Sequence, residues 1–392
     1  MSRKEQIIRI RGLIDQYLEV LESQRNMQNM KLWKNPYSWN RDMWRGVPVK
    51  GSGQIPYTIA SDNSLWAKIL NISLVDYYNN PYTYMETQLK MKLYHFNHFN
   101  DNTPFTDELF IWFGVITELS MFGSEIVYYE HKEAWIKEPI IKEYEDAEKI
   151  AIPNFYKSGL MPKIHQYYEV MSELADGKLK VMFPDFARGP FCIVAHLRGL
   201  EKILMDMFLN PDFVHKMMRF LVDANKLWTE ERNKFLGVEK HKSKLYNDEI
   251  DCPTLSPEVY REMIFPYEKE LSEYHGGISY WHSCGNTTKF IETIGMLPNL
   301  ELLHVGPWTS YKEADIVFGD KTALDICLNP QVDVLEADEV GMAQKLQNIM
   351  ESCLHNNYTV RADGFMPHGD VESEIVQIKK WAAIAKKYLA QK

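Results

Sequence analysis

The feature that most limits how this chain can fold is a repeated alternation, from about residue 106 onward, of short apolar runs with long amphipathic stretches. Helical periodicity occupies most of the intervals between the apolar runs. Such an alternation is typical of repeated strand and helix units that build a parallel sheet. The runs that predict strands are 179–186, 190–197, 244–248, 278–284, 300–306, 322–328 and 358–364.

A closed (β/α)8 TIM barrel accounts for this pattern better than an open doubly wound sheet, which would need a glycine-rich phosphate turn after its first strand. The sequence contains neither GxGxxG nor GxxxxGK[ST]. Residues 1–105 show helices and loops but no barrel strand. We therefore predict an α/β protein in which residues 106–392 form the barrel. Residues 1–105 are expected to form a mainly helical N-terminal extension over or beside its mouth.

Charge and composition narrow the class of partner. The 392 residues include 54 acidic and 44 basic ones, a net charge of -10, and the Lys and Arg are scattered. We therefore predict a small-molecule substrate, no nucleic-acid site and no membrane anchor. No apolar run reaches the roughly 18 residues of a membrane span, which predicts a cytoplasmic protein.

The five cysteines, an odd number, predict free thiols or metal ligands. A homo-oligomeric state stays open.

Polar residues that close predicted strands are the candidate site residues, because TIM-barrel enzymes carry their chemistry at the C-terminal ends of the strands. The acidic pair Asp248 and Glu249 is a candidate for general acid or base work or for metal ligation, against the alternative of a surface acidic cluster. His304 is a candidate for substrate contact, against the alternative of a rim histidine. The other strand ends of this kind carry His282 with Cys284, Cys327, and Asp363.

The run YWHSCGNTT places a histidine and a cysteine two positions apart on one predicted strand. Side chains alternate along a strand, so Tyr280, His282 and Cys284 should face the barrel interior, with Trp281 and Ser283 facing the surrounding helices. Imidazole and thiolate are preferred zinc donors, and His282 with Cys284 would supply two of the three protein ligands of a catalytic zinc. A core strand without metal is the alternative for this short motif.

Three segments, 190–214, 246–271 and 278–294, resemble the uroporphyrinogen decarboxylase superfamily, and HSCGN resembles its cobalamin-dependent methyltransferase branch. The resemblance implies zinc bound by His282 and Cys284, and a corrinoid (cobalamin) carried by a partner protein. The branch's further cysteine has no counterpart here, because the chain reads YTVRADGFMPHG near its last strand. We predict a carboxylate in its place, Asp363 or Glu249. The alternatives for this third ligand are Cys327 or another group, and a site without metal is a further alternative.

The function that this resemblance implies is a zinc-dependent methyltransferase that moves a methyl group between a small O-methylated compound and a corrinoid protein. An aryl methyl ether is one candidate substrate, because 13% of the residues are aromatic. The alternatives are a decarboxylase like the family's founding enzyme and a non-catalytic barrel that binds a ligand. Arginines near the N-terminus hold substrate carboxylates in the wider family, but for Arg41 and Arg45 we favour a surface ion pair.

Overall fold

A parallel sheet forms the centre of the computed structural model, which describes residues 3–36 and 45–390. Six strands pair in the order β1-β10-β9-β8-β7-β6, and β2 pairs with β5 in a separate parallel pair. A parallel bridge between Arg188 and Tyr246 joins the segment after β5 to β6. The eight strands are β1 Tyr57–Ser61, β2 Glu108–Phe110, β5 Lys180–Met182, β6 Ser243–Tyr246, β7 Ile278–His282, β8 Leu302–Val305, β9 Ala323–Leu328 and β10 Tyr358–Phe365. This arrangement confirms the predicted α/β TIM barrel.

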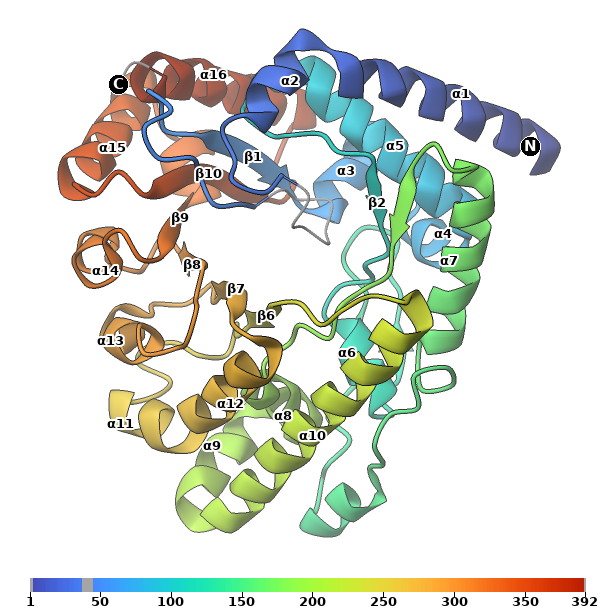
Figure 1. Ribbon diagram of the computed structural model, residues 1–392, viewed down its shortest axis with the longest axis vertical. Helices are drawn as coiled ribbons and strands as arrows, with labels where there is room; N and C mark the ends of the chain where they lie inside the picture. The colour runs from blue at the N-terminus through green and yellow to red at the C-terminus, as the bar shows by residue number, and fades with distance from the viewer. Residues whose placement is uncertain (1–2, 37–44, 391–392) are drawn as a thin grey trace.

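Helices surround the strands as an outer ring (Figure 1). Those before β6 are α1 Arg3–Glu22, α2 Gln24–Met30, α3 Asn63–Leu70, α4 Leu74–Asn79, α5 Pro81–His98, α6 Ile116–Met121, η1 Tyr144–Lys149, α7 Met161–Ala175, α8 Pro190–Arg198, α9 Leu200–Leu209 and α10 Pro211–Leu236, with a hairpin of β3 Ile126–Val127 and β4 Trp135–Ile136. Those after β6 are α11 Pro257–Val259, η2 Tyr260–Ile264, α12 Phe265–His275, η3 Thr288–Phe290, α13 Ile291–Ile294, α14 Tyr311–Phe318, η4 Pro330–Leu335, α15 Glu339–Ser352 and α16 Val371–Leu389. In the described ranges no helix is long and apolar enough to cross a membrane.

Two strand predictions are wrong for physical reasons. The run 190–197 forms helix α8, which begins with Pro190 in its first turn, where proline's fixed φ suits a helix. Most of α8 is buried, so its sequence shows no polar face and cannot be told from a core strand by periodicity. In addition, β1 is a barrel strand within residues 1–105, where none was predicted. The division at residue 105 stays a prediction.

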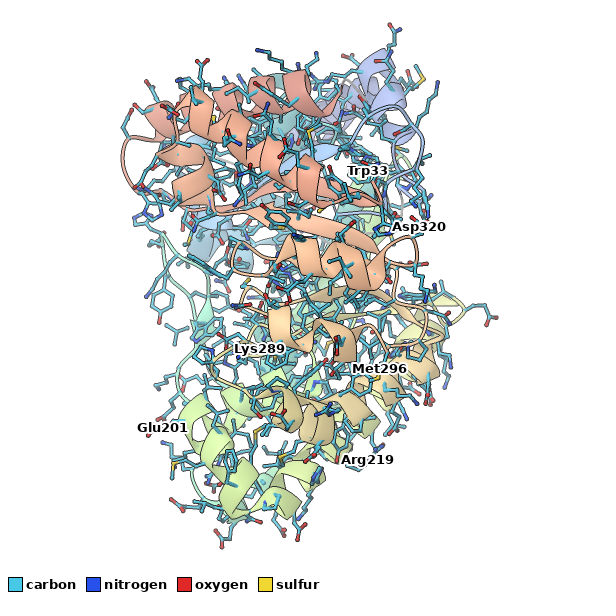
Figure 2. All side chains as sticks on the ribbon, turned by 90° about the vertical axis from the view of Figure 1, so that its left-hand side faces the viewer. Trp33, Glu201, Arg219, Lys289, Met296 and Asp320 are labelled. Atoms are coloured by element: carbon cyan, nitrogen blue, oxygen red, sulfur yellow. The ribbon has the colours of Figure 1, made fainter. Side chains whose placement is uncertain are left out.

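The N-terminal helix lies outside the ring rather than over the mouth. Helix α1 packs against α5 and α7 (Figure 1). Leu32 and Trp33 then pack in one buried cluster with Leu302 and Ala323, the first residues of β8 and β9. Figure 2 shows Trp33 and Asp320 toward the same edge of the molecule. The segment after α2 therefore closes the barrel at the N-terminal ends of its strands.

The predicted orientation of β7 is confirmed. Trp281 points outward, where its indole Nε1 donates to the carboxyl of Glu268 on α12 at 3.0 Å. Tyr280 points inward, and its hydroxyl donates to Asp325 on β9 at 2.9 Å. Ser283 turns away from the cavity described below and donates to the Ile250 carbonyl at 2.8 Å.

Glu268 is fully buried between α12 and the sheet, and its carboxyl also accepts a hydrogen bond from the Tyr260 hydroxyl at 2.8 Å. Burial raises the pKa of Glu268 to about 7, against the lowering effect of these donors. Between about pH 4.5 and 7 the folded protein therefore keeps a proton on Glu268 that the unfolded chain has lost. The free energy of unfolding should fall as the pH rises through this window.

We expect Glu268→Gln to remove this pH dependence. Between pH 5 and pH 7.5 the wild type should lose about 2 to 3 kcal/mol of stability relative to the variant, measured by urea unfolding. Glu270→Gln on the same helix is the control, because ion pairs lower the pKa of Glu270 to about 2, below this window. Parallel pH profiles for wild type and Glu268→Gln would contradict the assignment.

Candidate functional site

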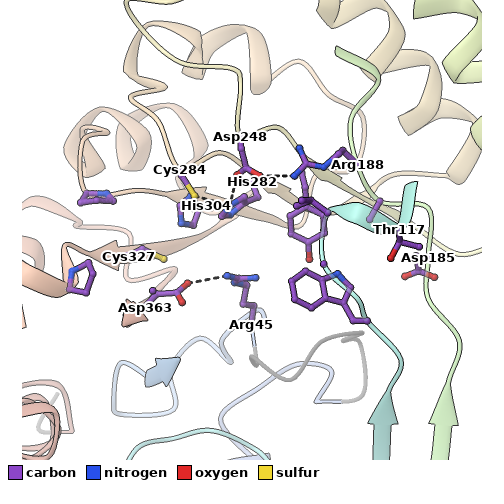
Figure 3. A pocket seen from close by; sticks show the side chains of 18 of the residues that line it. Arg45, Thr117, Asp185, Arg188, Asp248, His282, Cys284, His304, Cys327 and Asp363 are labelled. Carbon is purple, nitrogen blue, oxygen red and sulfur yellow. Dashed lines mark hydrogen bonds and ion pairs between the residues drawn. The ribbon is translucent and has the colours of Figure 1, made fainter. Parts of the chain in front are cut away.

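A cavity of about 530 Å³ lies at the C-terminal ends of the strands (Figure 3). Its walls combine large apolar side chains with buried charged groups. The apolar residues include Trp112, Val115, Ala187, Pro307, Trp308 and Leu328. The titratable residues are Arg45, Glu118, Asp185, Arg188, Tyr246, Asp248, His282, Cys284, His304, Cys327 and Asp363.

Asp248, His282 and Cys284 form a compact group on one wall, and one potential ligand atom from each lies within 4.8 Å of the others. His282 Nε2 is 3.0 Å from Asp248 Oδ1 and 3.3 Å from Cys284 Sγ. Bonds of about 2.0 to 2.3 Å to a tetrahedral zinc would separate its ligand atoms by roughly 3.3 to 3.8 Å. The group therefore needs little movement to hold a metal, and its oxygen, nitrogen and sulfur donors suit zinc.

The groups around this cluster aim the donor atoms at one another. His282 Nδ1 lies 3.4 Å from the Tyr280 hydroxyl, so that its Nε2 faces the other two residues. The second oxygen of Asp248, Oδ2, accepts from Arg188 Nη2 at 3.2 Å, which leaves Oδ1 on the side of His282. Such outer contacts fix the orientation of metal ligands in known sites.

The electrostatics of the group follow from burial and from its neighbours. Burial alone would raise the pKa of Asp248, but hydrogen bonds and charge from His282 and Arg188 hold it well below its usual value. Burial, with the carboxylates of Asp248 and Asp363, raises the pKa of Cys284. Asp248 is therefore ionised and Cys284 protonated in the metal-free protein. A bound cation would leave Asp248 ionised and would deprotonate Cys284, because coordination to a metal deprotonates a thiol.

The two carboxylates predicted as third ligand lie outside this group. Glu249 contacts Arg188 at 3.3 Å and His196 of α8 at 2.6 Å. Asp363 accepts from Arg45 Nη2 at 3.0 Å. The structure thus brings Asp248, which the sequence marked as a candidate for acid or base work or for metal ligation, to the place expected of Glu249 or Asp363. His304 and Cys327 line the same cavity but do not join the group.

Arg45 is a buried cavity residue, so the surface ion pair favoured for it is wrong; Arg41 lies outside the described residues. Inside the barrel Arg45 meets Asp363 and lies 4.0 Å from Asp325, which also pairs with the buried Arg361. The two arginines and two aspartates neutralise one another at the base of the cavity.

Arg188 and Glu118 are site residues that sequence reasoning missed. Glu118 of α6 is buried and accepts the backbone N–H groups of Ala187 and Arg188 at 3.1 and 3.2 Å. The Arg188 guanidinium then reaches both Asp248 and Glu249. A signal was present in the run FARGP, because a charged residue between an apolar strand and a buried helix needs a partner inside the protein.

A more open groove of about 580 Å³ lies on the outer side of the same cluster. It shares Asp248, Cys284 and Trp308 with the inner cavity and is otherwise lined by Leu200, Glu249, Asp251, Cys252, Gly285 and Asn286. Two members of the Asp248–His282–Cys284 group, Asp248 and Cys284, therefore border both the inner cavity and the outer groove.

Comparison with known proteins identifies a family whose sequence model matches the chain and a solved structure with a similar fold. Residues 66–360 match the sequence model of the uroporphyrinogen decarboxylase (URO-D) family. Among solved structures, a methyltransferase from Methanosarcina mazei is similar, with a TM-score of 0.61 and 14% sequence identity. The alignment covers 87% of this chain and 95% of that one. No curated protein sequence matches the chain.

We expect the purified protein to bind one zinc ion at the three-residue group. His282→Ala, Cys284→Ser and Asp248→Asn should each weaken zinc binding by at least about 100-fold, because each removes a ligand or its charge. Glu249→Gln and Asp363→Asn should retain one zinc per chain by elemental analysis. Loss of zinc in either of these controls, with retention in Asp248→Asn, would assign the third ligand to the other carboxylate.

Proposed function

The chain belongs to the uroporphyrinogen decarboxylase family, and on that basis we propose that it is a zinc-dependent methyltransferase. It demethylates a small O-methylated compound, and the methyl group passes to a corrinoid carried by a partner protein. The observation that carries this proposal is the Asp248–His282–Cys284 group on the wall of the cavity. A decarboxylase of the founding type would have no use for a thiol beside an imidazole and a carboxylate.

The donor set fits zinc in a catalytic rather than a structural role. Three protein ligands leave a fourth position for a substrate atom, whereas a structural zinc is closed by four. When bound, zinc supplies Lewis acidity that neutralises the charge on the oxygen that loses its methyl group. A carboxylate in place of a second thiolate makes the site harder, which favours an oxygen substrate over a thiol.

The remaining residues hold and orient the substrate. Trp112, Val115 and Leu328 give the cavity apolar walls that suit an aromatic ring or another flat apolar body. Arg188, buried behind the ligands, keeps Asp248 ionised and directed at His282. The volume of about 530 Å³ admits a small aromatic compound.

The outer groove supports a protein-borne corrinoid as the second reactant. The groove reaches Cys284 and Asp248, which also line the cavity, and Trp308, shared by both spaces, is 62% exposed. A methyl group leaving a substrate in the cavity could therefore be taken up from the groove without the two reactants occupying the same space.

A decarboxylase that binds a polycarboxylate is the weaker alternative, because the cavity arginines are already paired with carboxylates. Such a ligand needs arginines whose charge is available to it. Here Arg45 is paired with Asp363, and Arg188 with both Asp248 and Glu249. The same cavity suits an uncharged substrate better.

The experiment is spectral. Zinc-loaded protein is mixed with cob(I)alamin and 2-methoxyphenol under anaerobic conditions. We expect the Co(I) absorption to decay as methylcobalamin forms, and His282→Ala and Cys284→Ser to lower this rate by at least about 100-fold. Cys353→Ser, a matched thiol change at a buried cysteine that does not line the cavity, should keep the rate. Transfer at an unchanged rate in Cys284→Ser, or carbon dioxide release from a porphyrinogen in its place, would contradict the proposal.

A further inference from the structure

Glu268 is a buried carboxyl that the proposed reaction does not use. It lies on α12, which packs against β6, and its side chain is fully buried and does not line the cavity. Burial of a carboxyl is unfavourable unless other groups form hydrogen bonds with it. The groups that do so here show what this carboxyl holds in place.

One of these groups is on β7. The indole Nε1 of Trp281 donates to Glu268 Oε2 at 3.0 Å. Trp281 directly precedes His282, and side chains alternate along a strand, so the indole faces the helices while the imidazole faces the cavity. A hydrogen bond that fixes the indole from behind therefore limits the rotation of the strand end that carries His282.

Another of these groups is at the end of β6. Asn247 directly precedes Asp248, and its side-chain amide acts on Glu268 as a hydrogen-bond donor. The amide nitrogen Nδ2 and the carboxyl oxygen Oε1 are both buried, and neither has a closer partner among the described residues. The carboxyl therefore interacts with the residue before each of two proposed metal ligands.

The surroundings leave Asn247 little freedom. A Cβ on Gly189 would collide with Asn247 Oδ1, so the amide fills the space that this glycine leaves. The backbone N–H of Asn247 donates to the His282 carbonyl at 2.7 Å, which ties the ends of β6 and β7 together. The two strand ends therefore share one direct hydrogen bond and one common anchor, Glu268.

We propose that Glu268 is a positioning residue for the Asp248–His282–Cys284 group. By holding the residue before His282 and the residue before Asp248, it keeps Nε2 and Oδ1, which lie 3.0 Å apart, close to the spacing that a metal needs. This inference deepens the proposed function and rests on its metal site. Outer contacts of this kind change metal affinity by about 10- to 100-fold in known sites.

The test measures the zinc affinity of the full chain by competition with a chelating dye, without any corrinoid. We expect Glu268→Leu and Trp281→Phe to bind zinc at least about 10-fold more weakly than the wild type. Glu268→Gln keeps the shape and an acceptor oxygen, so it should retain most of the affinity. Wild-type affinity in Glu268→Leu overturns the proposal, and Trp281→Phe decides the question if Glu268→Leu does not fold.

Two controls separate positioning from a general loss of stability. Tyr260→Phe removes the other hydrogen bond to Glu268 Oε2, from a residue on η2 rather than on a strand that carries a ligand. Trp228→Phe makes the same change of volume at a buried tryptophan of α10 that does not line the cavity. Both should lower the free energy of unfolding and keep the zinc affinity. A loss of zinc affinity in either control as large as that in Trp281→Phe would show that the proposal is wrong.

A spectroscopic measurement reports the ligand geometry itself. Cobalt(II) bound in place of zinc has visible absorption bands that depend on the arrangement of its ligands. These bands should shift in Trp281→Phe and match the wild type in Tyr260→Phe, whereas identical bands in all three proteins overturn the proposal. If the zinc and cobalt results hold but no methyl reaches cobalamin, the proposed function fails and this inference stands. If methyl transfer proceeds and zinc affinity is independent of Glu268, this inference alone fails.

Discussion

The site depends on one buried cation. Arg188 enters the barrel from the segment after β5. Its guanidinium forms ion pairs with Asp248 and Glu249, at 3.2 and 3.3 Å. An isolated charge at this depth would cost several kcal/mol, so the arginine and its two carboxylates hold each other in place. Glu118 adds a third carboxyl group, which accepts the Arg188 backbone N–H. Asp248 can therefore present one oxygen to His282 while the other remains bound to the arginine.

A second set of charges supports the opposite side of the cavity. Arg45 and Arg361 pair with Asp363 and Asp325, and Tyr280 donates to Asp325. Tyr280 also approaches His282, so this network reaches the proposed ligands through one side chain. The arginines of both sets are paired with carboxylates of the protein itself. The barrel interior is thus a set of internal ion pairs with apolar walls between them, rather than a receptor for a highly charged ligand.

The sequence predicted the second half of the barrel well, because β6 to β10 alternate with helices. It failed where local pattern carries no information. Helix α8 is mostly buried and so lacks a period, and β1 is a short buried strand in a helical neighbourhood. Strand alternation placed His282 and Cys284 on one face correctly. Neighbouring residues such as Asp248 and Glu249 diverge after a strand end, however, so the strand pattern does not show which one turns toward His282. In the structure Asp248 contacts His282, whereas Glu249 contacts His196.

The shared wall between the cavity and the groove has a kinetic consequence. Trp308, Asp248 and Cys284 border both spaces. A large partner bound in the groove would therefore cover part of the rim of the cavity. A small molecule would then enter before the partner arrives and leave after the partner departs. Under the proposed function, such an arrangement would impose an order of addition and release on the two reactants, with a ternary complex as the state in which they meet.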